Sequence, residues 1–307
     1  MRDFGDTAGF GSKLLDGQWR KKPVVGRKII SSKFIRNFNE ERFLKWTDRT
    51  SGSVRLFDSH ANGDALSGLL TNAKLVRSYF EKIRELKSAL TFHMNDVELV
   101  DQDIFELRQS FEIPFWWRLD DIIATLSTPE SGIGYHAGHE DGIIVQLYGS
   151  RRWCVWAETC TPTNYRYQLL APGEGPNPRI SRPKSKCDML LDVHLSPGDV
   201  LYIPPFFPHE GVTTDTSVSL SIAWKGIGPA SFLPKSLFEN IESSRKTETL
   251  TKATLLFDES LAASEAIQLW KNQSLRIIPE DLRERYQSLI HESIKDHVLY
   301  LAQRYCN

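Results

Sequence analysis

The sequence contains little cysteine and no long apolar run. Its four cysteines, at positions 154, 160, 187 and 306, form no CxxC pair and show no disulfide-scaffold spacing, which is typical of a reducing cytoplasm. No stretch approaches the roughly 20 apolar residues that cross a bilayer, and the N-terminus lacks the apolar segment of a secretory signal. These absences predict a cytoplasmic protein without a membrane partner.

An excess of charge of one sign is also missing. The 38 Lys and Arg residues balance the 39 Asp and Glu residues, so the formal net charge is −1. Broad nucleic-acid or membrane-surface binding needs a basic excess, so we expect neither. With 307 residues, 40% hydrophobic and no internal repeat, the chain suits one large domain or a core domain with a smaller appendage.

The periodicity of apolar residues changes twice along the chain. Up to about residue 117 it is mainly helical, and residues 66–90 in particular predict one or two amphipathic helices. From 118 the runs are short, β-branched and aromatic, and are bounded by Gly, Pro or Asp, as in antiparallel strands. After Pro229 the helical period returns. The order predicts a mainly β protein with flanking helices (α+β): a helical lead-in at 1–114, a jelly-roll or cupin barrel at 115–228 and a helical region at 229–307.

Two histidines within the strand-rich part are framed by turns. His136 follows the glycine-rich "SGIG", and His209 follows the rigid "PPFFP". Neutral imidazoles presented from separate strands can converge on one ion, and they suit iron, zinc or copper. Taken alone, each residue is more simply interpreted as an unrelated loop histidine. Because both follow turns or rigid segments next to predicted strands, a metal site is favoured.

The segment 115–227 resembles the JmjC-type cupin oxygenases, and among them the bacterial ribosomal oxygenases. The matching motifs are "WRLDD" (117–121), Ser-x-Pro at 127–129, "GxGxH" ending at His136, a D-x4-Q-x2-G-x-R-x-W pattern over 141–153, and "PGDVLYIPPFFPHEG" (197–211). The N-terminal "WRKKPVV" (19–25) is also similar to the family's lead-in. The resemblance implies an enzyme that uses Fe(II), O2 and 2-oxoglutarate to hydroxylate an arginine of a ribosomal protein.

Position by position, the resemblance assigns roles to several residues. It makes His136 and His209 the iron ligands. It places Arg151 and Thr125 at the distal carboxylate of 2-oxoglutarate, and Ser221 on a strand that lines the same site. A guanidinium fork suits a carboxylate because it is always charged and bidentate.

The family's third iron ligand is an acid two residues after the first histidine, and here that position is Gly138. The same His-x-Gly change marks the non-haem iron halogenases, in which chloride fills the vacated position. Three interpretations remain. In the first, which we favour, Gly138 admits chloride and the enzyme chlorinates an amino acid, aminoacyl group or peptide. In the second, Glu140 or another acid supplies the carboxylate and the enzyme hydroxylates an amino-acid residue. In the third, the site is degenerate, the protein is an inactive binding module, and His139, Glu140 and Asp141 form a solvated polar rim.

The region after Pro229 resembles the helical part through which ribosomal oxygenases dimerise, so we expect a homodimer. We expect no room within these 307 residues for the winged-helix module that closes the longer members of the family. That module helps to form the substrate surface there. A small-molecule or peptide substrate is therefore as compatible with this sequence as a ribosomal protein.

Overall fold

The computed structural model of the protein describes residues 2–50, 54–58, 65–70, 73–171, 180–183, 188–243 and 262–305. Its helices are α1 (Thr7–Leu15), α2 (Ser32–Ile35), α3 (Glu40–Thr47), α4 (Ala73–Glu85), α5 (Gln102–Ser110), α6 (Thr163–Leu170), α7 (Lys235–Ser243), α8 (Ala263–Arg276) and α9 (Glu280–Tyr305). Its strands are β1 (Val24–Gly26), β2 (Val54–Asp58), β3 (Ala65–Leu70), β4 (Leu90–Met94), β5 (Leu119–Ser127), β6 (Asp141–Tyr148), β7 (Arg151–Trp156), β8 (Met189–Leu195), β9 (Val200–Ile203), β10 (His209–Thr213) and β11 (Ser217–Trp224).

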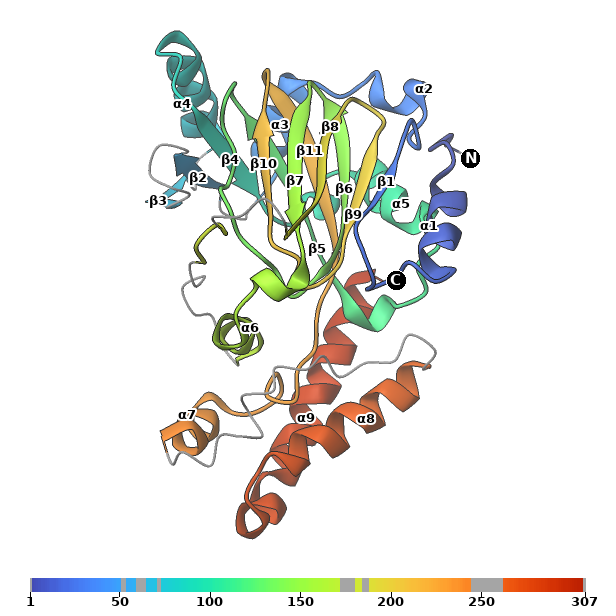
Figure 1. Ribbon diagram of the computed structural model, residues 1–307, viewed down its shortest axis with the longest axis vertical. Coiled ribbons are helices and arrows are strands. Elements are labelled where there is room, and N and C mark those ends of the chain that lie inside the picture. Colours follow the sequence, from blue (N-terminus) through green and yellow to red (C-terminus); the bar gives the residue numbers. More distant parts are fainter. Residues whose placement is uncertain are drawn as a thin grey trace.

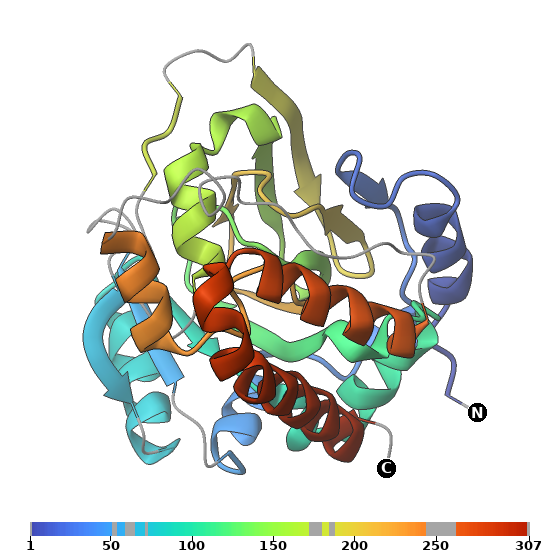
Figure 2. The same cartoon turned by 90° about the horizontal axis from the view of Figure 1, so that it is seen from below.

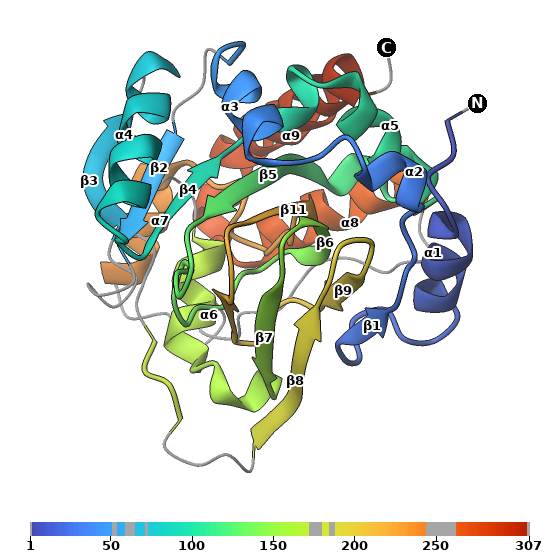
Figure 3. The same ribbon diagram turned by 90° about the horizontal axis from the view of Figure 1, so that it is seen from above.

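These strands form two antiparallel sheets that face each other. The larger has the order β1-β9-β6-β11-β5-β4-β2-β3, and the smaller has the order β10-β7-β8. Figures 1 and 3 show the smaller sheet standing opposite the central strands of the larger one, with helices outside. The predicted jelly-roll core with helical flanks is confirmed.

Alternation along the central strands gives the larger sheet one apolar and one polar face. On β5, Ile122, Ala124 and Leu126 are buried in the main hydrophobic core. Successive side chains of a strand point to opposite faces, so the residues between them face the space between the sheets. On β5 and β11 this second face carries the buried hydroxyls of Thr125, Ser127, Ser217 and Ser219. The sequence pattern therefore places polar side chains inside the barrel.

One helical prediction is wrong in part. Residues 66–90 were expected to form one or two amphipathic helices, but α4 covers only Ala73–Glu85 and residues 65–70 form β3. β3 pairs with β2 in the register Val54↔Leu70 and extends the larger sheet by one edge strand. In so short a segment, hydrogen bonds to a neighbouring strand determine the conformation more strongly than the spacing of the apolar residues does.

The C-terminal region forms a helical hairpin across one end of the barrel (Figure 2). Trp270 of α8 is fully buried, with its ring 5.4 Å from that of Phe232 and 6.0 Å from that of His297 on α9. None of the helices within the described ranges has the length and apolar character to cross a bilayer. Residues 244–261 of the predicted helical region lie outside the described residues, and the three-part division of the chain stays a prediction.

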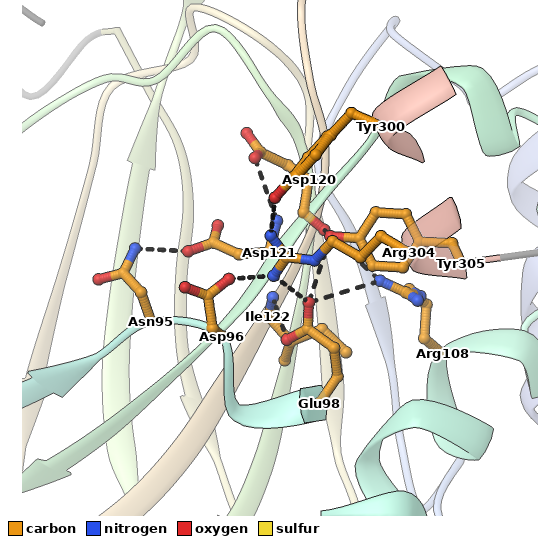
Figure 4. A network of polar contacts seen from close by, with 10 residues as sticks. All are labelled: Asn95, Asp96, Glu98, Arg108, Asp120, Asp121, Ile122, Tyr300, Arg304 and Tyr305. Atoms are coloured by element: carbon orange, nitrogen blue, oxygen red, sulfur yellow. Dashed lines mark hydrogen bonds and ion pairs between the residues drawn. The ribbon is translucent and has the colours of Figure 1, made fainter. Parts of the chain in front are cut away.

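The end of α9 is joined to the barrel wall by a network of charged side chains (Figure 4). Arg304 forms ion pairs with Asp96 and Glu98. The hydroxyl of Tyr305 donates to the backbone oxygen of Asp120 at 3.1 Å. These contacts hold the helical hairpin against the first residues of β5.

The same network contains an acid with an altered pKa. Burial, and then the charge of Asp120, raise the pKa of Asp121 to about 7. The amide of Asn95 donates to the Asp121 carboxylate at 2.5 Å. Asp121 therefore keeps a proton in the folded chain at pH values at which an unfolded chain has lost it.

We expect this proton to make the free energy of unfolding fall as the pH rises from about 4 to about 7, by roughly 3 to 4 kcal/mol for this group. Between these pH values the native state binds more protons than the unfolded state, so raising the pH lowers the free energy of unfolding. In the Asp121→Asn variant the free energy of unfolding should depend less on pH. Urea unfolding at a series of pH values measures this dependence. An unchanged slope in Asp121→Asn would show that Asp121 ionises normally.

A second buried charge cluster surrounds Asp141, the first residue of β6. Its carboxylate accepts from Arg118 Nη2 at 2.6 Å and from the hydroxyl of Tyr202 at 2.6 Å, and Arg20 Nε lies 3.4 Å away. Asp141 is fully buried. The interpretation of Asp141 as a solvated rim residue is therefore wrong, because its carboxylate is buried and pairs with the guanidinium of Arg118.

Asp141→Asn should lower the free energy of unfolding by about 3 kcal/mol, because it leaves the buried guanidinium of Arg118 without its counter-charge. Asp192→Asn is the matched control. It breaks the exposed Arg152–Asp192 pair, whose side chains are 51% and 42% exposed, and should cost less than about 1 kcal/mol. Equal losses in urea unfolding would contradict this assignment.

Candidate metal and co-substrate site

His136 and His209 face each other across an isolated antiparallel bridge. The backbone nitrogen of His136 donates to the oxygen of His209 at 3.1 Å, and the reverse bond is 2.8 Å long. Directly opposed residues of an antiparallel pair project their side chains to the same side. The two ring centroids are accordingly 4.3 Å apart. The structure thus brings together the two histidines that the sequence singled out.

In both imidazole rings Nδ1 contacts a backbone carbonyl oxygen, and Nε2 is the nitrogen left to bind a metal ion. Nδ1 of His136 lies 2.9 Å from the oxygen of Gly134, and Nδ1 of His209 lies 2.9 Å from the oxygen of Phe207. A carbonyl oxygen only accepts, so each Nδ1 carries the hydrogen and each Nε2 keeps a lone pair. Burial lowers the pKa of both rings, and that of His209 to about 3. Neutral rings with fixed tautomers are the form that binds a metal ion.

Arg151, the first residue of β7, provides a buried cation inside the barrel. Its Nη2 donates to Ser127 at 2.5 Å and its Nη1 donates to Thr125 at 3.3 Å. Burial alone lowers the pKa of this guanidinium to about 10. Its Nε has no hydrogen-bond partner among the described residues. Every group that the guanidinium bonds is a neutral hydroxyl, so its charge is uncompensated and suits an anionic ligand.

The hydroxyl groups around Arg151 were only partly predicted. Thr125 is present as expected, and it shares a 2.9 Å hydrogen bond with Ser219. Ser127 and Ser217, at 2.5 Å and 3.5 Å from Arg151 Nη2, were missed. Ser221 lies on the same face of β11 but further from Arg151 along the strand, opposite Ile123. Period-2 alternation from Thr125 on β5 and from Ser221 on β11 would have found the missed serines.

The space beside Gly138 is not empty. A Cβ atom placed on Gly138 would lie 2.2 Å from Oε2 of Glu140. The other carboxylate oxygen of Glu140 lies 3.2 Å from Nε2 of His139. Within the described ranges, no group of three or more His, Cys, Asp and Glu side chains is arranged to hold a metal ion. The histidine pair therefore has a carboxylate near it that does not complete a metal site in this arrangement.

The residues nevertheless fit ferrous iron and 2-oxoglutarate. His136 and His209 offer two unprotonated nitrogens from one bridge, and imidazole is a common ligand of iron. Arg151 offers an unmet charge and an unmet N–H inside the same barrel. A dicarboxylate can bind the metal through one end and the guanidinium of Arg151 through the other.

Comparison with known proteins supports this arrangement. Residues 106–228 match the family model of the JmjC domain. The chain is 33% identical over 214 residues to the ribosomal protein uL16 3-hydroxylase of Escherichia coli K12, a match that covers 69% of this chain and 52% of that protein. It is 25% identical over 208 residues to a probable ribosomal oxygenase of Haemophilus influenzae, covering 68% of this chain and 48% of that protein. The chain thus spans about half the length of these two relatives.

Solved structures show the same fold. The crystal structure of the Escherichia coli ribosomal oxygenase YcfD superposes with a TM-score of 0.53 at 19% identity, over 90% of this chain and 69% of that one. The structure of YcfD in complex with cobalt and 2-oxoglutarate gives a TM-score of 0.51 over 91% of this chain and 70% of that one. The motifs, the facing sheets and the family match agree. Residues 106–228 are thus similar to the JmjC domain, and the structure places them on a jelly-roll barrel.

Proposed function

We propose that this protein is an Fe(II)- and 2-oxoglutarate-dependent oxygenase that hydroxylates an amino-acid side chain of a protein or peptide. One observation carries the proposal. Arg151 is a buried cation whose hydrogen-bond partners are all neutral, and it lies in the same barrel as two imidazoles with free Nε2 atoms. The JmjC domain match and the curated relatives support the same chemistry.

Each residue then has a defined task. His136 and His209 would hold the iron through Nε2, while the carbonyl oxygens of Gly134 and Phe207 keep both rings in position. Arg151 would bind the distal carboxylate of 2-oxoglutarate. When bound, the two groups together supply O2 activation: one oxygen atom enters the substrate C–H bond, and the other enters succinate as 2-oxoglutarate releases CO2. Thr125 and Ser127 accept hydrogen bonds from the guanidinium and hold it in place.

Hydroxylation accounts for the site better than chlorination. The halogenase interpretation requires the position vacated at Gly138 to be open to an anion. Instead, Oε2 of Glu140 lies where a side chain at 138 would begin. A carboxylate beside this position repels an anion by charge. The comparisons also give no support to halogenation, since both bacterial relatives carry names of oxygenases or hydroxylases.

The relatives suggest a substrate class. One is named a ribosomal protein uL16 3-hydroxylase, and another match, from Drosophila persimilis, is named a bifunctional lysine-specific demethylase and histidyl-hydroxylase. Both names describe action on side chains of proteins. We therefore take a ribosomal protein or a peptide from one as the substrate of this chain. Dimerisation through residues 229–307 stays a prediction, as do the cytoplasmic location and the absence of a nucleic-acid partner.

Arg151→Met should weaken 2-oxoglutarate binding by about 10- to 100-fold, because it removes charge-assisted hydrogen bonds to the distal carboxylate. It should not lower the free energy of unfolding of the ligand-free protein, since it also removes an uncompensated buried charge. Isothermal titration calorimetry with Mn²⁺ present measures the affinity. Arg152→Met, which changes the exposed neighbour that pairs with Asp192, is the control and should bind normally. Unaltered binding by Arg151→Met, or no binding by the unmodified protein, would contradict the proposal and favour an inactive binding module.

The reaction itself is tested by mass spectrometry. The organism's own uL16 is incubated with the protein, Fe(II), 2-oxoglutarate and O2 in a chloride buffer. We expect uL16 to gain the mass of one oxygen atom and none to gain chlorine. Incorporation of chlorine would restore the halogenase interpretation. An unmodified uL16 would overturn this choice of substrate.

A further inference from the structure

The side chain of Glu140 bends back over Gly138. Oε2 of Glu140 lies 2.2 Å from the place of a Cβ atom on Gly138. The backbone of Gly138 is not left-handed, since this residue is absent from the glycines with positive φ. A side chain at 138 is therefore permitted by the backbone, and the atom nearest to its Cβ would be Oε2 of Glu140. An aspartate at 138 would compete with Glu140 for one space.

Other acids near the histidines are already engaged. Asp141 forms a buried ion pair with Arg118 and accepts a hydrogen bond from the hydroxyl of Tyr202. Glu210, next to His209, forms a 2.5 Å ion pair with Arg182. Oε1 of Glu140 lies 3.2 Å from Nε2 of His139. Among these acids Glu140 can change its rotamer at least cost, because its side chain is 32% exposed and, within the described ranges, forms no ion pair with Arg or Lys.

His139 holds one of the two carboxylate oxygens. Its Nε2 lies 3.2 Å from Oε1 of Glu140, while its Nδ1 is buried and has no partner among the described residues. A ring bonded in this way donates through Nε2 and leaves Oε2 of Glu140 directed at Gly138. Carboxylates that bind metals are commonly oriented by such a hydrogen bond to the second oxygen.

We infer that Glu140 supplies the third metal donor of this protein, from a His-x3-Glu spacing in place of His-x-acid, and that His139 is the positioning residue that orients it. Oε2 now lies where the Cβ of an aspartate would be, rather than its carboxylate. The side chain must therefore rotate towards the histidine pair when a metal binds, which agrees with the lack of a complete ligand group in this arrangement. The inference rests on the proposed function for the presence of a metal ion.

The test measures Co²⁺ affinity of the full chain by isothermal titration calorimetry, with the visible spectrum of bound Co²⁺ as a second readout of coordination. Glu140→Gln, which preserves shape, and Glu140→Ala should each weaken Co²⁺ binding by at least about 10-fold. Adding Gly138→Asp to Glu140→Ala should restore the affinity, because an aspartate then enters the space that the glutamate has left. Asp192→Asn should bind as the unmodified protein does.

The role of His139 has its own control. His139→Ala should weaken Co²⁺ binding by about 10-fold, and His139→Gln, which keeps a donor, should recover part of the loss. In the Gly138→Asp/Glu140→Ala background, His139→Ala should have no effect, because no glutamate remains to be oriented. A merely structural role of His139 would weaken binding in both backgrounds.

The outcomes separate the two proposals. If the unmodified protein binds no Co²⁺, the proposed function fails. If it binds Co²⁺ and Glu140→Gln binds equally well with the same spectrum, only the assignment of Glu140 fails. Failure of Gly138→Asp to rescue a folded Glu140→Ala protein would also overturn the inference.

Discussion

The site depends on one pair of backbone hydrogen bonds, those between His136 and His209. They join a glycine-rich turn to the start of β10, and so fix the relative position of two segments that are distant in the sequence. Every other feature of the histidine pair follows from this bridge. It places both rings on one side, and carbonyl oxygens two residues before each histidine then select the tautomer. The metal-binding geometry is thus set by the main chain, not by the side chains alone.

The polar lumen has an equally simple origin. β5 and β11 alternate apolar and hydroxyl residues, and the apolar set is buried against the helices. The hydroxyl residues therefore face the smaller sheet, where they contact Arg151 of β7. A cation enclosed by neutral hydroxyls is costly to bury. The barrel tolerates that cost at the point where an anionic ligand would offset it.

Much of this could be predicted from the sequence, and the remainder fails for identifiable reasons. The strand-rich core, the histidine pair and the position of Arg151 follow from turn residues, spacing and family resemblance. Ser127 and Ser217 were overlooked because a serine in a strand gives no signal until its partner strand is known. The true environment of Asp141 was invisible because Arg20, Arg118 and Tyr202 come from three separate segments. Gly138 was misleading for another reason: a missing side chain was read as free space, whereas Glu140 of the same turn fills it.

The attachment of α9 also bears on how the chain acquires its structure during synthesis. Glu98 is buried beside β5 and lies 3.0 Å from Arg304, although more than two hundred residues separate the two in the order of translation. While the ribosome is still producing the intervening segments, the nascent barrel must carry this acid without that guanidinium. Until α9 is synthesised, the cation that can pair with Glu98 is Arg108, 3.9 Å away in the finished structure, so the wall next to Asp120 gains the charge of Arg304 last.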